Sequence, residues 1–332
     1  MANRYWVGGS ATWNTTNTSV WSASSGGTIG ASVPTSSDNV FFDQSGSRVV
    51  NVSPGAVCAN ITVSAGTHTF QSTAPTIYGN VNLISSTIWN LNFTFGGTGS
   101  YTLTTNGVSG KNLLLSSACT VTLGSALTLT GAFTYLPSGS IFNTNGYSLS
   151  CGNFQFASGD SGTINFGSSL VTVVTLTSTA LQNVTMTSSP GAVLSITTPI
   201  GNPVIKPKSG NYMPALRFSG SGLVTIDNSC TYQDISSSYV GAKVFKFTAG
   251  TTNTFIGFSL RGTAGQLYTI TSTTTSAASL KKAGTWYMGA NSINSGNNTN
   301  LTFSNGSGID YLDVSYITGV SVGSGSSWFF LR

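Results

Sequence analysis

The sequence predicts an all-β protein that folds as a right-handed parallel β-helix, or solenoid, with an N-terminal aromatic cap and a C-terminal β region. A pattern of about 20 residues recurs, as in solenoids built from strand–turn units. Its apolar residues are spaced by two, which places them on one face of a strand. Charged residues make up only 6% of the 332 residues, but Phe, Tyr and Trp reach 11%. A disordered chain has few such large side chains, so the composition indicates a folded β-protein.

The repeat unit begins with Asn or Ala and continues with two apolar residues that flank one other residue. It starts at Asn60, Asn80, Asn112, Ala132, Asn153 and Asn183. Successive starts are 20, 32, 20, 21 and 30 residues apart, which predicts coils of about 20 residues, two of them with a turn lengthened by about 10. A second apolar pair, such as Val121 and Leu123, predicts the next face of the same coil. Asn suits tight turns, so we expect stacked, hydrogen-bonded Asn residues at the corners.

Residues 1–50 are predicted to cap the N-terminal end of the solenoid. Three of the six Trp residues, Trp6, Trp13 and Trp21, fall within this segment. The first coil of a solenoid leaves an open edge and an open core, which large aromatic side chains can cover. Exposed indole rings also stack on sugar rings, so glycan binding by these three residues stays open as an alternative.

The remaining chain divides into three parts by composition. Residues 51–200 hold the repeats of the β-solenoid, and residues 201–215 form a Pro-rich boundary, because Pro cannot donate a hydrogen bond to a central strand. Residues 216–332 hold short apolar strands with less regular spacing, which predicts either wider coils or a β-sandwich. Three aromatic residues near the end, Trp328, Phe329 and Phe330, either close the core or dock to a partner chain.

Candidate catalytic residues are few, because the seven acidic residues are all Asp. Glycoside hydrolysis commonly needs two carboxylates about 5–10 Å apart. The one pair retained as a catalytic candidate is Asp227 and Asp234, and Lys243 or Lys246 would serve beside it in a lyase. The single histidine, His68, has no acid next to it in the sequence pattern, which favours a structural role, and a Ser-His-Asp triad through it stays open.

No cofactor and no metal site is predicted. The sequence contains no P-loop, GxSxG, HExxH or EF-hand motif. The Cys residues are far apart in apolar surroundings and form no CxxC motif, which favours buried thiols over disulfides or metal ligands. These residues are Cys58, Cys119, Cys151 and Cys230.

Charge and hydropathy exclude two classes of partner. The net charge is +5, but the Lys and Arg residues are scattered, so no nucleic-acid partner is predicted. No apolar run is long enough for a membrane span. The first residues, MANRYWVGG, lack the basic and apolar regions of a signal peptide, so we expect synthesis in a host cytoplasm and release without Sec export.

A Trp- and Gly-rich motif opens the chain. It comprises Trp6-Val7-Gly8-Gly9, Thr12-Trp13-Asn14, Trp21-Ser22, Val33-Pro34-Thr35, Asp38 and Val40-Phe41. This motif resembles the opening of β-helical virion proteins of tailed phages, notably phages of aquatic bacteria, and related openings occur in bacterial surface β-helices. A second segment, Gly289-Ala290-Asn291-Ser292 with Ser295-Gly296-Asn297-Asn298, is similar to a segment near the C-terminus of such phage proteins, which commonly continue into Gly-Trp where this chain has Asn300-Leu301-Thr302-Phe303. The resemblance implies a virion structural role and supplies no catalytic residue.

These observations predict a non-enzymatic phage virion structural protein on the exterior of the particle, as a capsid decoration, knob or fibre. Its expected partners are other capsid or tail proteins, further copies of itself in a homo-oligomer such as a trimer, and a host glycan for attachment. Two alternatives stay open. One is a tailspike-like β-helix enzyme that degrades polysaccharide, and the other is a bacterial surface adhesin.

Overall fold

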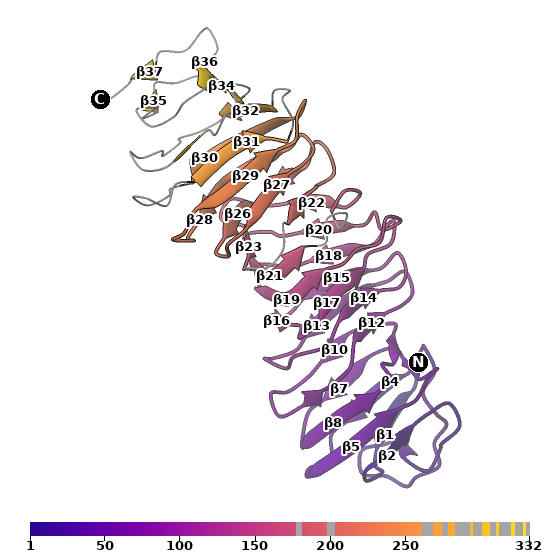
Figure 1. Ribbon diagram of the computed structural model, residues 1–332. Helices are drawn as coiled ribbons and strands as arrows, with labels where there is room; N and C mark the ends of the chain where they lie inside the picture. Colours follow the sequence, from indigo (N-terminus) through magenta and orange to yellow (C-terminus); the bar gives the residue numbers. More distant parts are fainter. Residues whose placement is uncertain are drawn as a thin grey trace. The chain divides into compact units, whose positions relative to one another are not determined.

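The computed structural model describes residues 1–176, 181–197, 203–260, 268–273, 278–282, 293–294, 301–305, 310–311, 320–322 and 328–329. These residues form strands joined by turns and contain no helix, so none of them forms a helix that could cross a membrane (Figure 1). The strands stack in parallel ladders, and the predicted all-β, right-handed parallel β-helix is confirmed. The chain divides into two compact units, Met1–Asn165 and Phe166–Arg332.

Three sheets build the first unit. The first sheet contains, in order of pairing, β3 (Trp21–Ser22), β1 (Asn3–Trp6), β4 (Asn39–Phe42), β7 (Ile61–Val63), β10 (Val81–Asn82), β13 (Ser100–Thr104), β15 (Thr120–Leu123), β18 (Ile141–Asn143) and β20 (Thr163–Asn165). The second contains β2 (Ala11–Trp13), β5 (Ser47–Val52), β8 (Thr67–Ser72) and β11 (Ile88–Trp89). The third contains β6 (Val57–Cys58), β9 (Thr76–Ile77), β12 (Phe93–Phe95), β14 (Leu113–Leu115), β17 (Ala132–Tyr135) and β19 (Leu149–Phe154), with β16 (Leu127–Thr128) also on β19. A coil such as β4–β5–β6 therefore visits each sheet once.

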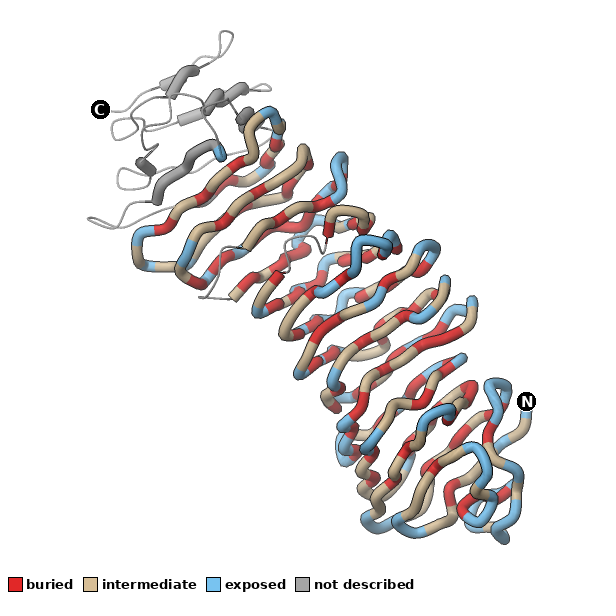
Figure 2. Tube along the Cα trace, turned by 45° about the vertical axis from the view of Figure 1, so that its right-hand side comes forward, coloured by how far each residue is buried: buried red, intermediate tan, exposed pale blue. Residues whose placement is uncertain are grey.

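Alternation along the strands fills the core of the first unit. In β14, Leu113 and Leu115 are buried and Leu114 between them is half-buried. The same alternation holds in β15, where Val121 and Leu123 are buried. Figure 2 shows buried positions along the strands and exposed positions at the corners. The prediction that the apolar pairs face a common core is therefore confirmed.

An Asn ladder follows one corner of the first sheet. Asn60 Nδ2 donates to Asn39 Oδ1 at 2.6 Å, and Asn60 Oδ1 accepts from the backbone N of Asn80 at 2.6 Å. Asn80 Oδ1 in turn accepts from the backbone N of Thr102 at 2.7 Å. The partners in these bonds are 20–22 residues apart, which is the length of one coil. The predicted stacking of corner Asn residues is confirmed here.

The predicted lengthening of a turn between Asn80 and Asn112 is wrong. Asn80 precedes β10 in the first sheet, whereas Asn112 precedes β14 in the third sheet. Asn112 belongs to a second ladder, in which its Nδ2 donates to Asn92 Oδ1 at 3.0 Å and its Oδ1 accepts from the backbone N of Ala132 at 2.7 Å. The interval of 32 residues arises because two sides of one coil carry the same pattern, each with a corner residue before an inward-facing apolar pair.

The N-terminal Trp residues fill the core of the first coil. Trp6, Trp13 and Trp21 are buried, and the ring centroids of Trp6 and Trp21 are 5.1 Å apart in an edge-to-face contact. β3 pairs antiparallel with β1 and covers the edge of the first sheet. These features confirm the aromatic cap. Sugar stacking needs exposed ring faces, so the alternative of a glycan platform is wrong for these three residues.

The second unit continues the parallel arrangement with coils of more variable length. One sheet orders β21 (Leu170–Leu176), β23 (Val193–Ile196), β26 (Ala215–Phe218), β28 (Thr231–Ser237), β30 (Thr252–Ser259), β32 (Ala278–Lys282), β34 (Leu301–Asn305) and β36 (Val320–Val322), with β25 (Tyr212–Met213) also on β28. The other orders β24 (Val204–Ile205), β27 (Leu223–Ile226), β29 (Lys243–Phe247), β31 (Tyr268–Ser272) and β33 (Ile293–Asn294). The unit also contains β22 (Thr185–Thr187) and the pair β35 (Asp310–Tyr311) and β37 (Trp328–Phe329). Partners on neighbouring strands are 19 residues apart for Leu216 and Ile235 and 27 for Asn253 and Leu280, so parallel coils of varying length replace the alternative β-sandwich.

The Pro-rich segment 201–215 lies inside the second unit. Its described strands β24 and β25 pair in parallel with β27 and β28 and so take part in the coils. The structure divides instead between Asn165 and Phe166, where the two compact units meet in the sequence. The cap segment, residues 1–50, likewise joins the coils directly, because β1 pairs with β4 and β2 pairs with β5.

Candidate functional site

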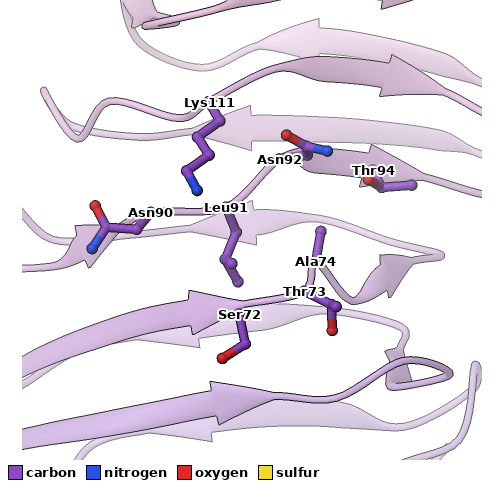
Figure 3. Close-up of a pocket in the computed structure, with 8 residues that line it drawn as sticks. All are labelled: Ser72, Thr73, Ala74, Asn90, Leu91, Asn92, Thr94 and Lys111. Atoms are coloured by element: carbon purple, nitrogen blue, oxygen red, sulfur yellow. The ribbon is translucent and has the colours of Figure 1, made fainter.

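A polar pocket opens at one corner of the first unit, between the second and third sheets. Its volume is about 410 Å³, within the range of roughly 300–1,000 Å³ that is typical of small-molecule sites. The lining residues are Ser72, Thr73, Ala74, Asn90, Leu91, Asn92, Thr94 and Lys111 (Figure 3). They come from the corners of three successive coils.

The pocket begins at the corner formed by residues 71–75, which is one residue longer than the equivalent corner of residues 90–93 in the next coil. Phe70 pairs with Trp89 and Thr76 pairs with Thr94, so six residue steps in the lower coil face five in the upper coil. Within the longer corner, Ser72 has a φ of 85°. This left-handed conformation is uncommon for residues other than Gly and persists only where the surrounding structure fixes it. The corners shorten from coil to coil here, because seven steps from Val50 to Val57 precede the six from Phe70 to Thr76.

Backbone hydrogen bonds hold the longer corner away from the coil above. The backbone N and the Oγ1 of Thr73 both donate to the Val52 carbonyl oxygen of the preceding coil, at 3.1 and 2.7 Å. In the following coils the backbone bonds cross this corner without interruption: Lys111 N donates to Leu91 O at 2.8 Å, and Gly131 N donates to Lys111 O at 2.7 Å. The pocket occupies the gap between Thr73 and Leu91.

The polar groups of the lining are oriented before any ligand binds. Asn92 Oδ1 accepts from Asn112 Nδ2 at 3.0 Å, and Asn112 Oδ1 is itself held by the backbone N of Ala132. This ladder fixes the amide of Asn92 so that its NH₂ group is the free donor. The hydroxyl of Thr73 donates its hydrogen to Val52, so its oxygen can accept from a ligand. The pocket thus offers donors and acceptors in fixed positions.

Lys111 is the one charged residue in the lining. Its side chain is exposed and extends from its own coil toward Asn90 and Leu91 of the coil below (Figure 3). The Asp residues of the first unit hold other partners: Asp38 accepts from Ala2 and Thr35, Asp43 from Gln44, and Asp160 from Ala157. In the part of the chain that the structure describes, no carboxylate pairs with Lys111, and the one ion pair found there joins Lys206 to Asp227.

The predicted carboxylate pair is divided between two sheets of the second unit. Asp227 follows β27, and its Oδ2 lies 2.9 Å from Lys206 Nζ. Burial raises the pKa of Asp227, but hydrogen bonds, first that from Lys206, bring it below the ordinary value. Asp234 lies in β28 with its carboxylate over Gly257 of β30, and burial raises its pKa. Neither carboxylate is among the groups that shift the other's pKa, so the structure does not unite them in an acid–base site.

The two Lys candidates for a lyase lie in β29. The Nζ of Lys243 donates to the Gly220 carbonyl oxygen and lies 5.6 Å from the ring centroid of Phe218 and 5.8 Å from that of Tyr239. Burial lowers the pKa of Lys243 to about 8. With a side chain only 3% exposed, Lys243 is out of reach of a polymeric substrate. Lys246 is half-buried on the other face of the strand.

His68 is enclosed in the core of the first unit. Its ring packs against Phe42 with centroids 5.3 Å apart, and neither ring nitrogen has a hydrogen-bond partner. A triad needs a histidine that bonds both a nucleophilic hydroxyl and a carboxylate. The geometry of His68 therefore excludes the triad, and the histidine is structural.

The four cysteines lie in the described part of the chain as buried thiols. All four Cys residues are buried and free, and burial raises the pKa of Cys119 to about 11 and that of Cys151 to about 12. Over the described ranges, no three His, Cys, Asp or Glu side chains gather as metal ligands would. The docking prediction for Trp328, Phe329 and Phe330 concerns side chains that lie outside the described part.

Sequence reasoning missed the pocket. Ser72, Asn90 and Lys111 stand in segments that read as ordinary polar corners of the repeat. One signal was present, because Lys111 is the only Lys before Lys206 in the sequence. A single Lys in a long stretch of Ser, Thr, Asn and Gly is a signal of a functional position. The sequence does not show which residues surround it in the fold.

Comparison of the chain with protein-family models, with curated proteins and with solved structures gave no match in any of the three. The pocket must therefore be interpreted from its own residues. Its lining contains hydroxyl groups, carboxamides, one ammonium group and the apolar side chains of Ala74 and Leu91. It contains no carboxylate, imidazole or thiol. This set of groups suits binding rather than acid–base or nucleophilic catalysis.

Proposed function

We propose that this chain is a non-enzymatic structural protein on the exterior of a phage particle, and that it attaches to a host-surface saccharide through the pocket at Lys111. The observation that carries the proposal is the pocket itself: a preformed polar site, without a catalytic group, on the side of a β-helix. A β-helix is compatible with fibre-like and tailspike-like proteins. The finer assignment is a capsid decoration, knob or fibre that assembles as a homo-oligomer, such as a trimer.

The lining supports a saccharide as the ligand class. Leu91 is buried, whereas Ala74, which is half-buried, provides a small apolar surface for the C–H face of a sugar ring. Around it, Asn92 offers an NH₂ donor and Thr73 an acceptor oxygen, which match the mixed donor and acceptor character of sugar hydroxyls. Because the ladder and the backbone already hold these groups, binding immobilises few side chains.

The surface of the chain supports an external structural role. Charged residues are only 6% of the sequence, and backbone groups are bonded from coil to coil along the ladders. Proteases cut mobile segments, so a chain whose backbone is bonded in this way offers them few sites for cleavage. The Trp-rich opening motif resembles that of phage virion proteins, which supports the assignment of the chain to a phage particle.

Two experiments test the proposal. First, the purified full chain is incubated with polysaccharide extracted from host cells, and retention on the polymer and release of reducing ends are both measured. We expect retention without release. No retention on any host polymer would refute adhesion, and release of reducing ends would refute the non-enzymatic assignment.

Second, particles purified from a host lysate by density gradient are probed with an antibody against the chain. We expect the chain to band with the particles and to be labelled on their exterior in electron micrographs. A chain that stays in the cell-envelope fraction would favour a bacterial surface adhesin instead. Light scattering of the purified chain gives its oligomeric state, and a trimer is the expected mass.

The enzyme alternative has one observation in its favour. Asp234 is a half-buried carboxyl group whose pKa is raised by burial, as in a general acid. If release of reducing ends is observed, Asp234→Asn is the variant to measure next. Loss of release in that variant would place the chemistry in the second unit, away from the pocket at Lys111.

A further inference from the structure

The pocket contains one positive charge that the protein itself does not neutralise. Lys111 reaches over the gap between its own coil and the coil below, and the three Asp residues of the first unit are engaged elsewhere. The ammonium group lies next to neutral amide and hydroxyl groups, so nothing in the lining repels an anion. An unpaired cation in such a site attracts an anionic ligand group.

We propose that the pocket selects a saccharide that carries a carboxylate, that is, a uronic acid unit, and that Lys111 is the counter-ion of this carboxylate. This inference rests on the proposed saccharide adhesion and names the sugar class. One Lys balances one charge, which fits a carboxylate better than a phosphate ester that carries nearly two charges at neutral pH. The hydroxyl groups of the same ring then meet Asn92 and Thr73, whose polar atoms are fixed by the ladder and by Val52.

The position of Lys111 explains how charge and hydroxyl recognition combine. The backbone N of Lys111 donates to the Leu91 carbonyl oxygen at 2.8 Å, and its backbone O accepts from Gly131 at 2.7 Å. The residue is therefore anchored to the coils on both sides, and only its flexible side chain moves. The side chain of Leu91 is buried and points away from Lys111, so the half-buried Ala74 is the apolar group of the lining that a sugar ring can meet. Because the Lys111 side chain extends toward Asn90 of the coil below, a ring bound in the gap presents its carboxylate to the ammonium group.

The test measures the binding of defined oligosaccharides to the full chain by calorimetry. The probes are a uronic acid oligosaccharide, the same oligosaccharide with its carboxyl groups reduced to alcohols, and a sulfated oligosaccharide of similar length. We expect the uronic acid oligosaccharide to bind at least about tenfold more tightly than its reduced form, and its affinity to fall as salt is added. Equal affinity for the acidic and reduced forms would overturn the proposal, and so would preferential binding of the sulfated probe.

Variants locate the effect. Lys111→Gln is expected to lower the affinity for the uronic acid oligosaccharide about tenfold and to leave the affinity for the reduced form unchanged. Lys111→Arg keeps the charge and is expected to retain most of the binding. Lys246→Gln makes the same change in net charge in the second unit and is expected to have no effect. If Lys246→Gln weakens binding as much as Lys111→Gln, the effect is one of net charge and the proposal is wrong.

A filling variant tests the pocket without a change of charge. Ala74→Phe is expected to abolish binding of both the acidic and the reduced oligosaccharide, because its ring occupies the gap. The outcomes distinguish a failure of the uronic acid inference from a failure of the proposed saccharide adhesion. Equal affinity of the wild type for the acidic and the reduced oligosaccharide would keep saccharide adhesion and remove the acid preference. Failure of the wild type to bind any host saccharide would remove both.

Discussion

Acidification is expected to destabilise the first unit through His68. The imidazole is fully buried, it packs edge-on against Phe42, and both of its ring nitrogens lack hydrogen-bond partners. Burial lowers the pKa of His68 below its ordinary 6.5, and the guanidinium group of Arg48 on the neighbouring coil adds to the lowering. The backbone at Gln44 and Ala65, which lies near the ring without the geometry of a hydrogen bond, and the Asp43 carboxylate act in the opposite direction, but less strongly. The folded protein therefore keeps this imidazole neutral where the unfolded chain would protonate it.

The magnitude follows from proton linkage. Below pH 6.5 the unfolded chain binds a proton at His68 that the folded chain does not, so the free energy of unfolding falls as the pH falls. One proton corresponds to a slope of about 1.4 kcal/mol per pH unit. The loss accumulates as the pH falls below 6.5 and stops growing once the folded imidazole is itself protonated at its lower pKa. Above pH 6.5 this contribution is fully present and constant.

Urea unfolding followed by Trp fluorescence measures this loss. Trp6, Trp13 and Trp21 are buried near His68 in the first coils and report on their unfolding. The matched control is His68→Phe, which keeps an aromatic ring and removes the titrating group. We expect the midpoint of the wild type to fall as the pH is lowered below 6.5, and that of the variant to stay level. An equal fall in both proteins, or no fall in the wild type, would refute the reasoning.

Four further predictions follow from buried and ladder positions. Leu115→Asp is expected to lower the free energy of unfolding by several kcal/mol because it buries an unpaired charge. Leu114→Asp, on the outward face of the same strand, should change the melting temperature little. Equal melting temperatures of the two variants would show that the strand register is wrong. Lys243→Met is expected to be at least as stable as the wild type at neutral pH. The free energy of unfolding of the wild type should rise by up to about 3 kcal/mol as the pH rises from about 8 toward 10.5, because the folded pKa of Lys243 lies below its unfolded value. A free energy of unfolding that stays constant over this pH range in urea titrations would contradict this. Asn60→Ala removes two ladder bonds and should cost about 1–2 kcal/mol in urea unfolding, whereas no change would show that the ladder is not stabilising. Cys119 should resist thiol reagents at neutral pH until the chain unfolds, because its pKa is about 11 and it is buried, so rapid labelling of the native protein would contradict this.

The regular parts of the fold were predictable from residue patterns. Alternation of apolar residues at positions such as Leu113 and Leu115 depends only on the period of a strand, and the structure buries both. The stacking of Asn60 on Asn39 follows from coils of nearly equal length, which the sequence also shows. The aromatic cap was predictable because three Trp residues cluster at the start of a solenoid.

The errors share a physical origin. The interval between Asn80 and Asn112 was interpreted as a longer turn because a linear pattern does not say which side of a coil each strand occupies. A turn between Asp227 and Asp234 leaves their pairing open in the sequence, but β27 and β28 belong to different sheets. In both cases two segments with the same local pattern belong to different faces.

The sequence by itself determined the all-β class, the coil length of about 20 residues and the inward positions, because these depend on local periodicity. Only the tertiary structure decided the pocket at Lys111. It depends on one extra residue between Phe70 and Thr76 and on the bonds from Thr73 to the preceding coil. Residues from three coils meet there although they are up to 39 positions apart in the sequence, from Ser72 to Lys111. Stacking brings such residues together, and no local pattern in the chain records which corners leave a gap.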